Sequence, residues 1–590
     1  MSRSIRFWGV AVSYSFVCRP VVLACLAVLA IHHPSVLAQP APNSSVLQEQ
    51  NRQLPTLPQL GAPDVKLPAV RRAYVGGDIK VKPSAVSFTG NTLIPTAELQ
   101  TVVGGLIGKD TDFNGLADAA AALRQYYASK GYVLTDVYLP EQSFGSAGGV
   151  VEFAVVEARI GKVKVTAAPG SGVSREFAQA LASSALVAGQ PVSQYALDKP
   201  VLLLRDMAGT DAEATVLPGA LPGEVDIEIA ISPTGARYEP YVSLDNQGVQ
   251  SSGQYRLAVG GTINAPFGMG DVFSARLQAA DQSGNLLYRL GYGLAVGSYG
   301  TKLTGSFTQS EYALAKQFAA LGASGLARVA ALSGVQPLIR GRFTNVFATG
   351  SLEHKTLDDN ISQSNLKTSK RINMLRLGLL GNHSDRTLAG ATNSFAVTLA
   401  GGNLELDAAS ALLDVGGPIA FGPRTAGSFG KLNYELQRVQ YFDDKSSVLL
   451  SLTGQLASKN LTSAEKVNLG GPQGVRGYPT GEGVGDDSVL LSVEYRFRTG
   501  FQIAGEMLNL TAFYDYGKVR RDHVRNDTTL NKAQTANDLT LDSAGVGVLL
   551  GREGNFVLTA ALAARVGGPA STTGDPEQRA RLWVLMQKWF

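Results

Sequence analysis

The sequence predicts a transmembrane β-barrel of about 16 antiparallel strands, preceded by two small α/β domains. Charged residues make up 17% of the chain, well below the roughly 25% of an average globular domain. Mean hydropathy is only +0.05, and no uncharged apolar run of about 20 residues follows the N-terminal segment, which argues against membrane-spanning helices. From residue 237 onward, segments of about ten residues alternate apolar and polar side chains between turns rich in Gly, Asp, Asn and Ser, as barrel strands do.

The first 38 residues resemble an export signal, with arginines, an apolar stretch at Val21–Ile31, no acidic residue and small residues ending at Ala38. A single inner-membrane anchor is the alternative, and a lipoprotein signal at Cys25 is disfavoured because apolar residues continue after it. Cys18 and Cys25 are the only cysteines, so the mature chain is expected to have none. Disulfide scaffolds, thiol catalysis and thiolate metal sites are thereby excluded. The net charge of +4 gives no indication of nucleic-acid binding.

Residues 39–80 are rich in Pro, Gln, Asn and Ser. A short helix is expected at Val46–Leu54 because Ser44 or Ser45 can cap it. The prolines from Pro55 to Pro68 end any continuous helix. We interpret this region as a short helix on a tether, although its composition is equally compatible with disorder.

Residues 81–160 are expected to form a β-α-α-β-β domain. The longer of its two helices carries an apolar face and ends at Gly131. The expected elements are a strand at Val81–Phe88, helices at Thr96–Val103 and Gly115–Lys130, and strands at Tyr132–Leu139 and Val150–Glu157.

Residues 161–234 are expected to repeat this order, which makes the two domains an internal structural repeat. Pro200 is expected to kink the second helix of this domain. The expected elements are a strand at Lys162–Thr166, helices at Ser174–Ser183 and Ser193–Met207, and strands at Ala212–Leu217 and Glu224–Ile231.

Residues 235–590 are expected to form the barrel. A soluble sandwich would also show alternation, but the segments are long, and bacterial barrels have even strand counts. The last segment, Arg579–Phe590, ends on two aromatic residues, which favour a membrane interface. The segments begin near residues 237, 253, 270, 285, 300, 324, 341, 371, 390, 427, 445, 488, 507, 541, 554 and 580.

The longest glycine-rich loop, Asn468–Asp486, contains an arginine that glycine content alone does not explain. It is not a phosphate-binding loop, because it lacks the Lys-Ser/Thr ending and no helix follows it. In the segment Leu508–Gly517, alternation places Asp515 on the lumen side, where a carboxylate can find water or a cation. A loop folded back into the lumen could therefore pair Arg476 with Asp515, and Gly517 would leave room for it.

These residues resemble the motifs of a known superfamily of outer-membrane assembly and secretion proteins. Its loop motif matches Val475, Arg476, Gly477, Tyr478 and Pro479, and its strand motif matches Phe513, Asp515 and Gly517. The two α/β domains resemble POTRA domains, and the stretches Asp245–Asp271 and Pro337–Phe347 resemble the two-partner secretion transporters. The resemblance implies a plug helix, a linker, two periplasmic POTRA domains and a 16-stranded barrel in the outer membrane. Three features depart from it: Pro200, Lys588 near the C-terminus, and the Pro- and Gln-rich segment before the first strand.

The resemblance further implies export of one large exoprotein, such as an adhesin or a cytolysin, through a barrel in outer-membrane lipid. Phe590 would close the barrel within a C-terminal signal used by the barrel-assembly machinery during biogenesis. A factor that inserts other outer-membrane proteins is the main alternative, but such relatives usually carry more POTRA domains. A passive pore would need no periplasmic domains.

An enzyme is not expected, and neither a catalytic residue, a metal nor a cofactor is assigned. The five histidines show no ligand spacing, and no nucleotide-binding motif is present. The acidic pairs Asp358–Asp359 and Asp486–Asp487 are expected to lie in solvated turns of the barrel. The histidines are His32, His33, His354, His383 and His523.

Overall fold

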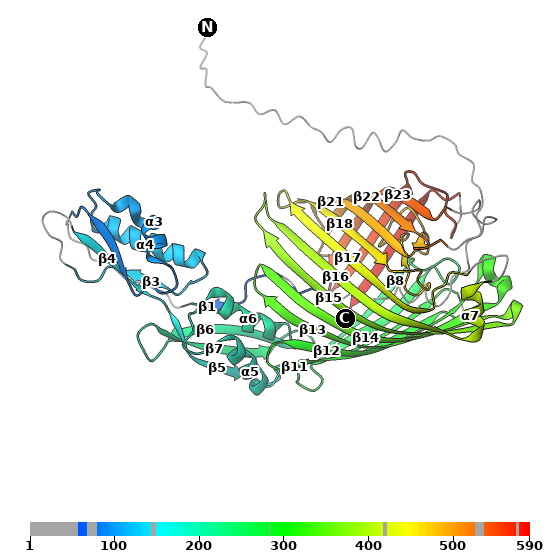
Figure 1. Ribbon diagram of the computed structural model, residues 1–590, viewed down its shortest axis with the longest axis horizontal. Helices are drawn as coiled ribbons and strands as arrows, with labels where there is room; N and C mark the ends of the chain where they lie inside the picture. Colours follow the sequence, from blue (N-terminus) through cyan, green and yellow to red (C-terminus); the bar gives the residue numbers. More distant parts are fainter. Residues whose placement is uncertain are drawn as a thin grey trace, which may run out of the picture.

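The computed structural model describes residues 57–58, 60–67, 80–142, 149–282, 284–416, 422–525, 536–573 and 577–590. The expected export signal (residues 1–38) and plug helix (46–54) lie outside the described residues. Two α/β domains precede a closed barrel, and the first of them lies farther from it than the second (Figure 1).

The first domain has the expected β-α-α-β-β order. A three-stranded sheet, ordered β2-β4-β3, packs against both helices around Leu99, Leu123 and Phe153. Asp112 caps α4 by accepting a 2.9 Å hydrogen bond from the Gly115 backbone N–H. The elements are β2 (Ala85–Thr89), α3 (Thr96–Val103), α4 (Phe113–Ser129), β3 (Asp136–Tyr138) and β4 (Val150–Val156).

Two expected strands of this domain are shorter than predicted. Val81 makes only an isolated bridge to Thr111, so β2 begins at Ala85. The chain at Tyr132 turns back, with the Thr135 N–H donating to the Tyr132 carbonyl, so β3 has three residues. Val81 and Tyr132 pack in the core of the first domain without joining its sheet, whereas Val133 and Leu134 pack against the core of the second domain. The alternation pattern cannot distinguish these roles from strand pairing.

The second domain repeats the order with longer strands. Ser174 and Ser193 cap its two helices, and α6 continues through Pro200. Its sheet has a fourth strand that the sequence did not predict: β1 (Val65–Lys66), from the linker, pairs in parallel with the outer edge of β6. The other elements are β5 (Arg159–Ala167), α5 (Arg175–Ala185), α6 (Gln194–Arg205), β6 (Thr210–Pro218) and β7 (Glu224–Pro233).

The barrel closes with 16 strands, because the last strand, β25, pairs with the first, β8. This confirms the predicted fold class. The expected acidic turn at Asp358–Asp359 is wrong, since both residues lie inside β14. The strands are β8 (Tyr238–Asp245), β9 (Arg256–Asn264), β10 (Val272–Ala280), β11 (Leu286–Val296), β12 (Thr301–Ala313), β13 (Ala323–Arg340), β14 (Thr344–Ile361), β15 (Leu366–Asp385), β16 (Ala391–Leu406), β17 (Gly427–Tyr441), β18 (Ser446–Ala457), β21 (Asp487–Ile503), β22 (Glu506–Arg520), β23 (Asp538–Arg552), β24 (Phe556–Arg565) and β25 (Ala580–Trp589).

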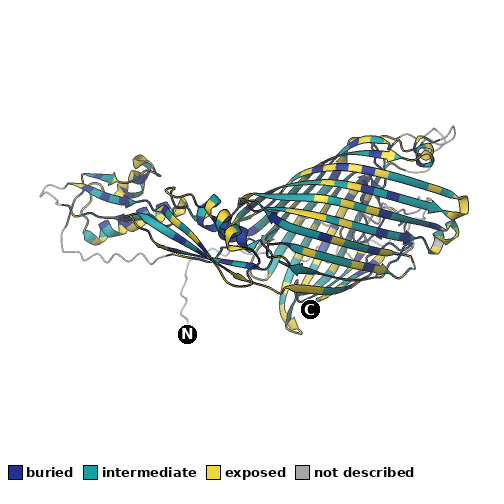
Figure 2. Cartoon of the chain, turned by 90° about the horizontal axis from the view of Figure 1, so that it is seen from below, coloured by how far each residue is buried: buried dark blue, intermediate teal, exposed yellow. Residues whose placement is uncertain are grey.

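Side chains alternate along the barrel wall as the sequence predicts. On β22, Leu510, Tyr514 and Tyr516 are exposed on the outside, whereas Phe513 and Asp515 are buried on the inside. Figure 2 shows this alternation of exposed and covered positions along the strands. None of the helices within the described ranges is both long enough and apolar enough to span a membrane.

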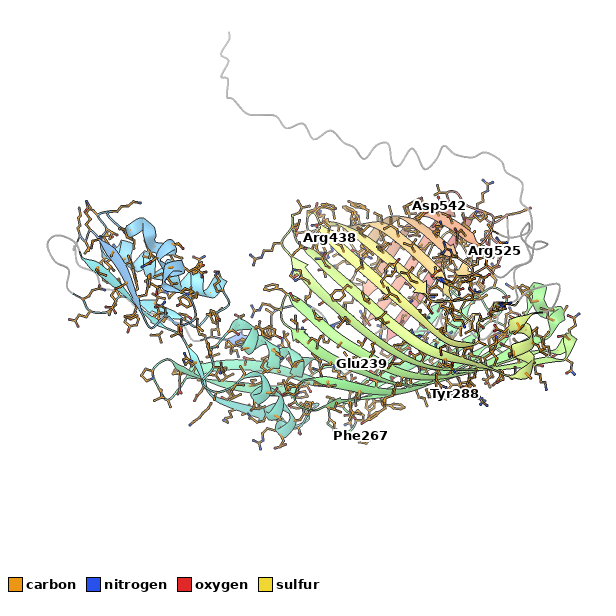
Figure 3. The ribbon with its side chains drawn as sticks, in the orientation of Figure 1. Glu239, Phe267, Tyr288, Arg438, Arg525 and Asp542 are labelled. Carbon is orange, nitrogen blue, oxygen red and sulfur yellow. The ribbon has the colours of Figure 1, made fainter. Side chains whose placement is uncertain are left out.

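The second α/β domain is fixed to the near end of the barrel by two bidentate arginine–aspartate ion pairs. Arg340, at the end of β13, donates hydrogen bonds of 2.8 and 2.9 Å to the Asp206 carboxylate. Arg342, in the turn before β14, donates hydrogen bonds of 2.7 and 2.8 Å to Asp198 on α6. Phe267, in the turn between β9 and β10, lies at the end of the barrel next to the α/β domains, whereas Asp542 lies toward the other end (Figure 3).

Candidate functional site

The candidate site is a loop, residues 458–486, that joins β18 to β21 and folds into the barrel. Its two arms pair through the short strands β19 (Val467–Asn468) and β20 (Val484–Gly485). At its tip, the Tyr478 N–H donates to the Val475 carbonyl over 3.0 Å, which closes a turn around Arg476 and Gly477. This turn presents the arginine to the barrel wall.

Arg476 forms a bidentate, hydrogen-bonded ion pair with Asp515. Nε and Nη2 of the guanidinium donate to the two carboxylate oxygens over 2.9 and 2.7 Å, and the Arg476 backbone N–H adds a third bond of 3.1 Å. The Asp515 side chain is fully buried. The structure thus brings together the two residues that the sequence analysis paired.

Neighbouring wall residues complete the surroundings of this pair. Glu494 on β21 accepts a 2.6 Å hydrogen bond from Arg476 Nη1, and the Ser492 and Ser543 hydroxyls donate to Asp515 over 2.7 and 3.2 Å. Phe513 lies beneath the guanidinium, whose Cζ is 3.3 Å from the ring centroid. Because β21, β22 and β23 are in register at these positions, one patch of wall supplies all of these contacts.

The glycines of the two motifs permit the close approach. A Cβ on Gly477 would lie 2.7 Å from the Ser543 Cβ and 3.0 Å from the backbone nitrogen of Arg565. A Cβ on Gly517 would lie 2.9 Å from the Val475 side chain. Val475 and Tyr478 are fully buried, so the loop tip packs directly on the wall.

A second anchor of the loop was missed by the sequence analysis. Glu465, fully buried in the same loop, accepts a 2.7 Å hydrogen bond from Lys355 Nζ and lies 2.8 Å from Lys431 Nζ. Arg376 is 3.5 Å away. These cations come from β14, β15 and β17, on a different part of the wall from Asp515. The alternation of apolar and polar residues along the strands can place these cations in the lumen. It cannot identify Glu465 as their partner, because that residue lies far from them along the chain.

The far arm of the loop is held through two further carboxylates. Glu482 accepts hydrogen bonds from the backbone N–H groups and hydroxyls of Thr572 and Thr573, in the loop that precedes β25. Asp486 is fully buried and accepts from the backbone N–H groups of Leu461 and His523. The expected solvated turn at Asp486–Asp487 is therefore wrong, because Asp486 orders the base of the loop.

The remaining expected residue, Phe590, lies at the closing seam. Its backbone N–H donates to the Pro240 carbonyl over 3.0 Å, next to the pairing of β25 with β8, and its side chain is exposed. Within the described residues, no cluster of three or more His, Cys, Asp or Glu side chains could hold a metal ion. The arrangement holds a segment of chain inside a polar lumen.

Residues 223–548, more than half of the chain, match the family described as haemolysin secretion/activation protein ShlB/FhaC/HecB. Residues 81–158 match the ShlB-type POTRA domain. The heme/hemopexin transporter protein HuxB of Haemophilus influenzae is 25% identical over 500 residues, which is 85% of each chain. The outer membrane transporter CdiB of Dickeya dadantii is 21% identical over 413 residues, covering 67% of this chain and 68% of CdiB.

Solved structures share the fold. CdiB from Escherichia coli superposes with a TM-score of 0.66 at 17% identity, covering 90% of this chain and 94% of CdiB. BamA from Haemophilus ducreyi lacking POTRA domains 1–3 gives a TM-score of 0.51 at 13% identity, covering 87% of this chain and 100% of that one.

Proposed function

The chain belongs to the haemolysin secretion/activation family ShlB/FhaC/HecB, and we propose that its POTRA domains bind an unfolded exoprotein that the barrel then passes to the cell surface. It is an outer-membrane β-barrel transporter of the two-partner secretion type, with its POTRA domains in the periplasm. The finer steps proposed here are how the exoprotein is recognised and what the loop at 458–486 does.

The placement of the second POTRA domain carries this proposal. Because Arg340 and Arg342 fix it at the barrel mouth, an extended chain bound to its sheet is delivered directly to the lumen. Strand addition suits an unfolded protein, since its backbone groups supply the hydrogen bonds and side chains add specificity.

The lumen suits the passage of a polar, extended chain. One cavity inside the barrel is lined by hydroxyl, amide and charged groups from strands β11 to β17, including Arg289, Thr308, Glu353 and Gln437. We propose that the loop, held by Arg476, fixes the shape of this lumen on one side. Its residues Val475, Gly477 and Tyr478, together with Phe513, Asp515 and Gly517 on the wall, would be positioning residues for export.

No catalytic step is proposed. Export would be driven by binding of the exoprotein in the periplasm and by its folding outside the cell. Outer-membrane lipid around the barrel and the assembly machinery that inserts it complete the proposed partners, with Phe590 as part of the insertion signal.

A comparison of culture supernatant and outer-membrane proteins, with and without the gene, tests the proposal. Loss of one large extracellular protein with unchanged membrane barrels is the expected result. A general fall in outer-membrane barrels would instead indicate an assembly factor. A wild-type strain that exports nothing more than the deletion strain would refute the export function.

A further inference from the structure

The outer face of strands β14 to β17 carries a horizontal row of polar side chains. The row consists of register partners on successive strands: His354, Asn373, Asn403 and Ser428. These side chains point away from the lumen, because Lys355, which follows His354 along β14, is buried on the inner side. The His354 Nδ1 and Asn373 Oδ1 atoms are 2.7 Å apart. The row marks a height at which the outer wall of the barrel changes from apolar to polar.

This polar row lies at the level of the lipid head groups in the outer leaflet. At the POTRA end of β14, the outward residue Thr344 is hydrogen-bonded to His383 over 2.8 Å. Thr344 and His354 are ten residues apart on β14, which is about 33 Å along the strand and about 25 Å in height at the usual tilt of barrel strands. That height equals the apolar band of an outer-membrane barrel, about 25 Å. The outward residues between them are apolar or glycine: Val346, Ala348, Gly350 and Leu352.

One register row farther from the POTRA domains, two exposed arginines point outward. Arg328 of β13 and Arg371 of β15 are both register partners of Thr356 on β14, which places their Cα atoms about 10 Å apart. Arg328 donates a 3.1 Å hydrogen bond to Gln309. Within the described part of the chain neither arginine is in an ion pair, although Glu405 is the register partner of Arg371. Two such cations, with a hydroxyl between them, can converge on one phosphate group.

On the membrane side of the polar row, the outer wall forms an apolar hollow. Three leucines that are register partners, Leu332, Leu352 and Leu375, are 54%, 58% and 47% exposed. Gly305 of β12 and Gly401 of β16 flank them in the same register row. No described atom lies within 4 Å of the position that a Cβ would take at either glycine. The hollow continues up to the polar row, so it can seat an acyl chain directly below the two arginines.

We propose that this outer face of β12 to β16 binds a phosphorylated lipid of the outer leaflet, with a phosphate between Arg328 and Arg371 and an acyl chain in the hollow. Charge, hydrogen-bonding groups and apolar surface follow one another toward the membrane in the order of the parts of such a lipid. Charge complementarity selects this occupant, because a neutral lipid would leave both arginines without a counter-ion. The outward cations of β22 differ, since Lys518 and Arg520 lie 3.6 and 3.4 Å from the Asp538 carboxylate.

Native mass spectrometry of the purified full chain in detergent micelles tests the site, with lipid A as the phosphorylated probe. The R328Q/R371Q variant should bind lipid A about tenfold more weakly than the wild type, since two ion pairs with phosphate are lost. The matched control is K518Q/R520Q, which removes two outward cations that already have a carboxylate, and it should bind as the wild type does. Heat-modifiable gel mobility shows that each barrel is folded. Equal affinity of R328Q/R371Q and the wild type for lipid A would overturn the inference.

Three further measurements test the parts of the lipid separately. Lipid A without its phosphates should bind the wild type about tenfold more weakly, and equal binding of the two lipids would overturn the role of the phosphate. The G305L/G401L variant should fill the hollow, because nothing described lies near a Cβ at either position, and should also bind lipid A more weakly. Unchanged affinity would overturn the assignment of the hollow to an acyl chain. Inorganic phosphate at the concentration of lipid A should not displace it, and displacement would show an anion site in place of a lipid site.

Discussion

Replacing Arg476 with alanine should release the loop tip from the barrel wall. The substitution removes both bonds of the guanidinium fork to Asp515 and the bond to Glu494. It leaves Asp515 fully buried without its cation. Breaking a buried ion pair by removing one partner costs about 3–5 kcal/mol. The population of loop tips detached from the wall should therefore rise by at least a hundredfold.

The population of detached loop tips can be measured by the labelling rate of a single cysteine placed beneath the loop. Leu541 on β23 is fully buried in a cluster with Leu469, Val475 and Tyr478 of the loop. Both native cysteines, Cys18 and Cys25, lie in the predicted export signal, so L541C gives the sole thiol of the expected mature chain. Maleimide labelling of L541C/R476A should be faster than that of L541C by the same factor of at least a hundred. Secretion should fall while heat-modifiable gel mobility shows a folded barrel.

The conservative variant R476K separates charge from geometry. Lysine keeps the positive charge but cannot form the planar fork, so labelling and secretion should be intermediate. Wild-type labelling rates in L541C/R476A would refute the argument that this ion pair holds the tip. Normal secretion despite fast labelling would refute the proposed role of the loop in export.

Three other variants test the remaining contacts. E465Q should loosen the loop by about 3–5 kcal/mol, because three wall cations lose their buried anion; unchanged L541C labelling would contradict this. R340A should expose the junction between the second POTRA domain and the barrel to added protease. R342A should do so less, since its side chain is 25% accessible against 4% for Arg340, and an equal effect would argue against burial as the cause. G477A should cost about 1–3 kcal/mol by overpacking, seen as faster labelling, and an unaltered rate would show that the wall can adjust.

Alternation was sufficient to predict the barrel. Every strand begins within about five residues of its expected start, because lipid and lumen impose opposite polarities on neighbouring positions. The same alternation predicted that Asp515 faces the lumen. Arg476 was predicted as its partner because it is the only arginine in the glycine-rich loop Asn468–Asp486. The starts of two helices were also predictable from the sequence. The helices were expected to begin at Ser174 and Ser193, and these serines are the N-caps of α5 and α6.

Contacts between distant segments could not be predicted in this way. Glu465 meets cations that lie more than 30 residues away along the chain, and no local pattern marks the partners of a buried carboxylate. Strand β1 has two residues in a proline-rich linker, too few for any period. Asp358 and Asp359 were assigned to a turn because acidic pairs favour solvent. Instead, β14 continues past them, and their carboxylates accept hydrogen bonds from Ser369 and Tyr312 on other strands of the barrel.

The relative strength of the contacts indicates which segment moves during export. The loop is held by four anchors, Arg476, Glu465, Glu482 and Asp486, of which the first two form buried ion pairs with the barrel wall. Each of those two ion pairs would cost about 3–5 kcal/mol to break by loss of one partner. Within the described residues, the linker is held by single hydrogen bonds at Gly61 and Pro58 and by the two-residue strand β1, each bond worth about 1 kcal/mol. Its two ion pairs, Lys66–Glu213 and Asp64–Arg205, are partly exposed and add little. These bonds are weaker than the buried anchors of the loop, so less free energy is needed to break them. The linker should therefore leave first, while the loop remains a fixed wall of the open channel.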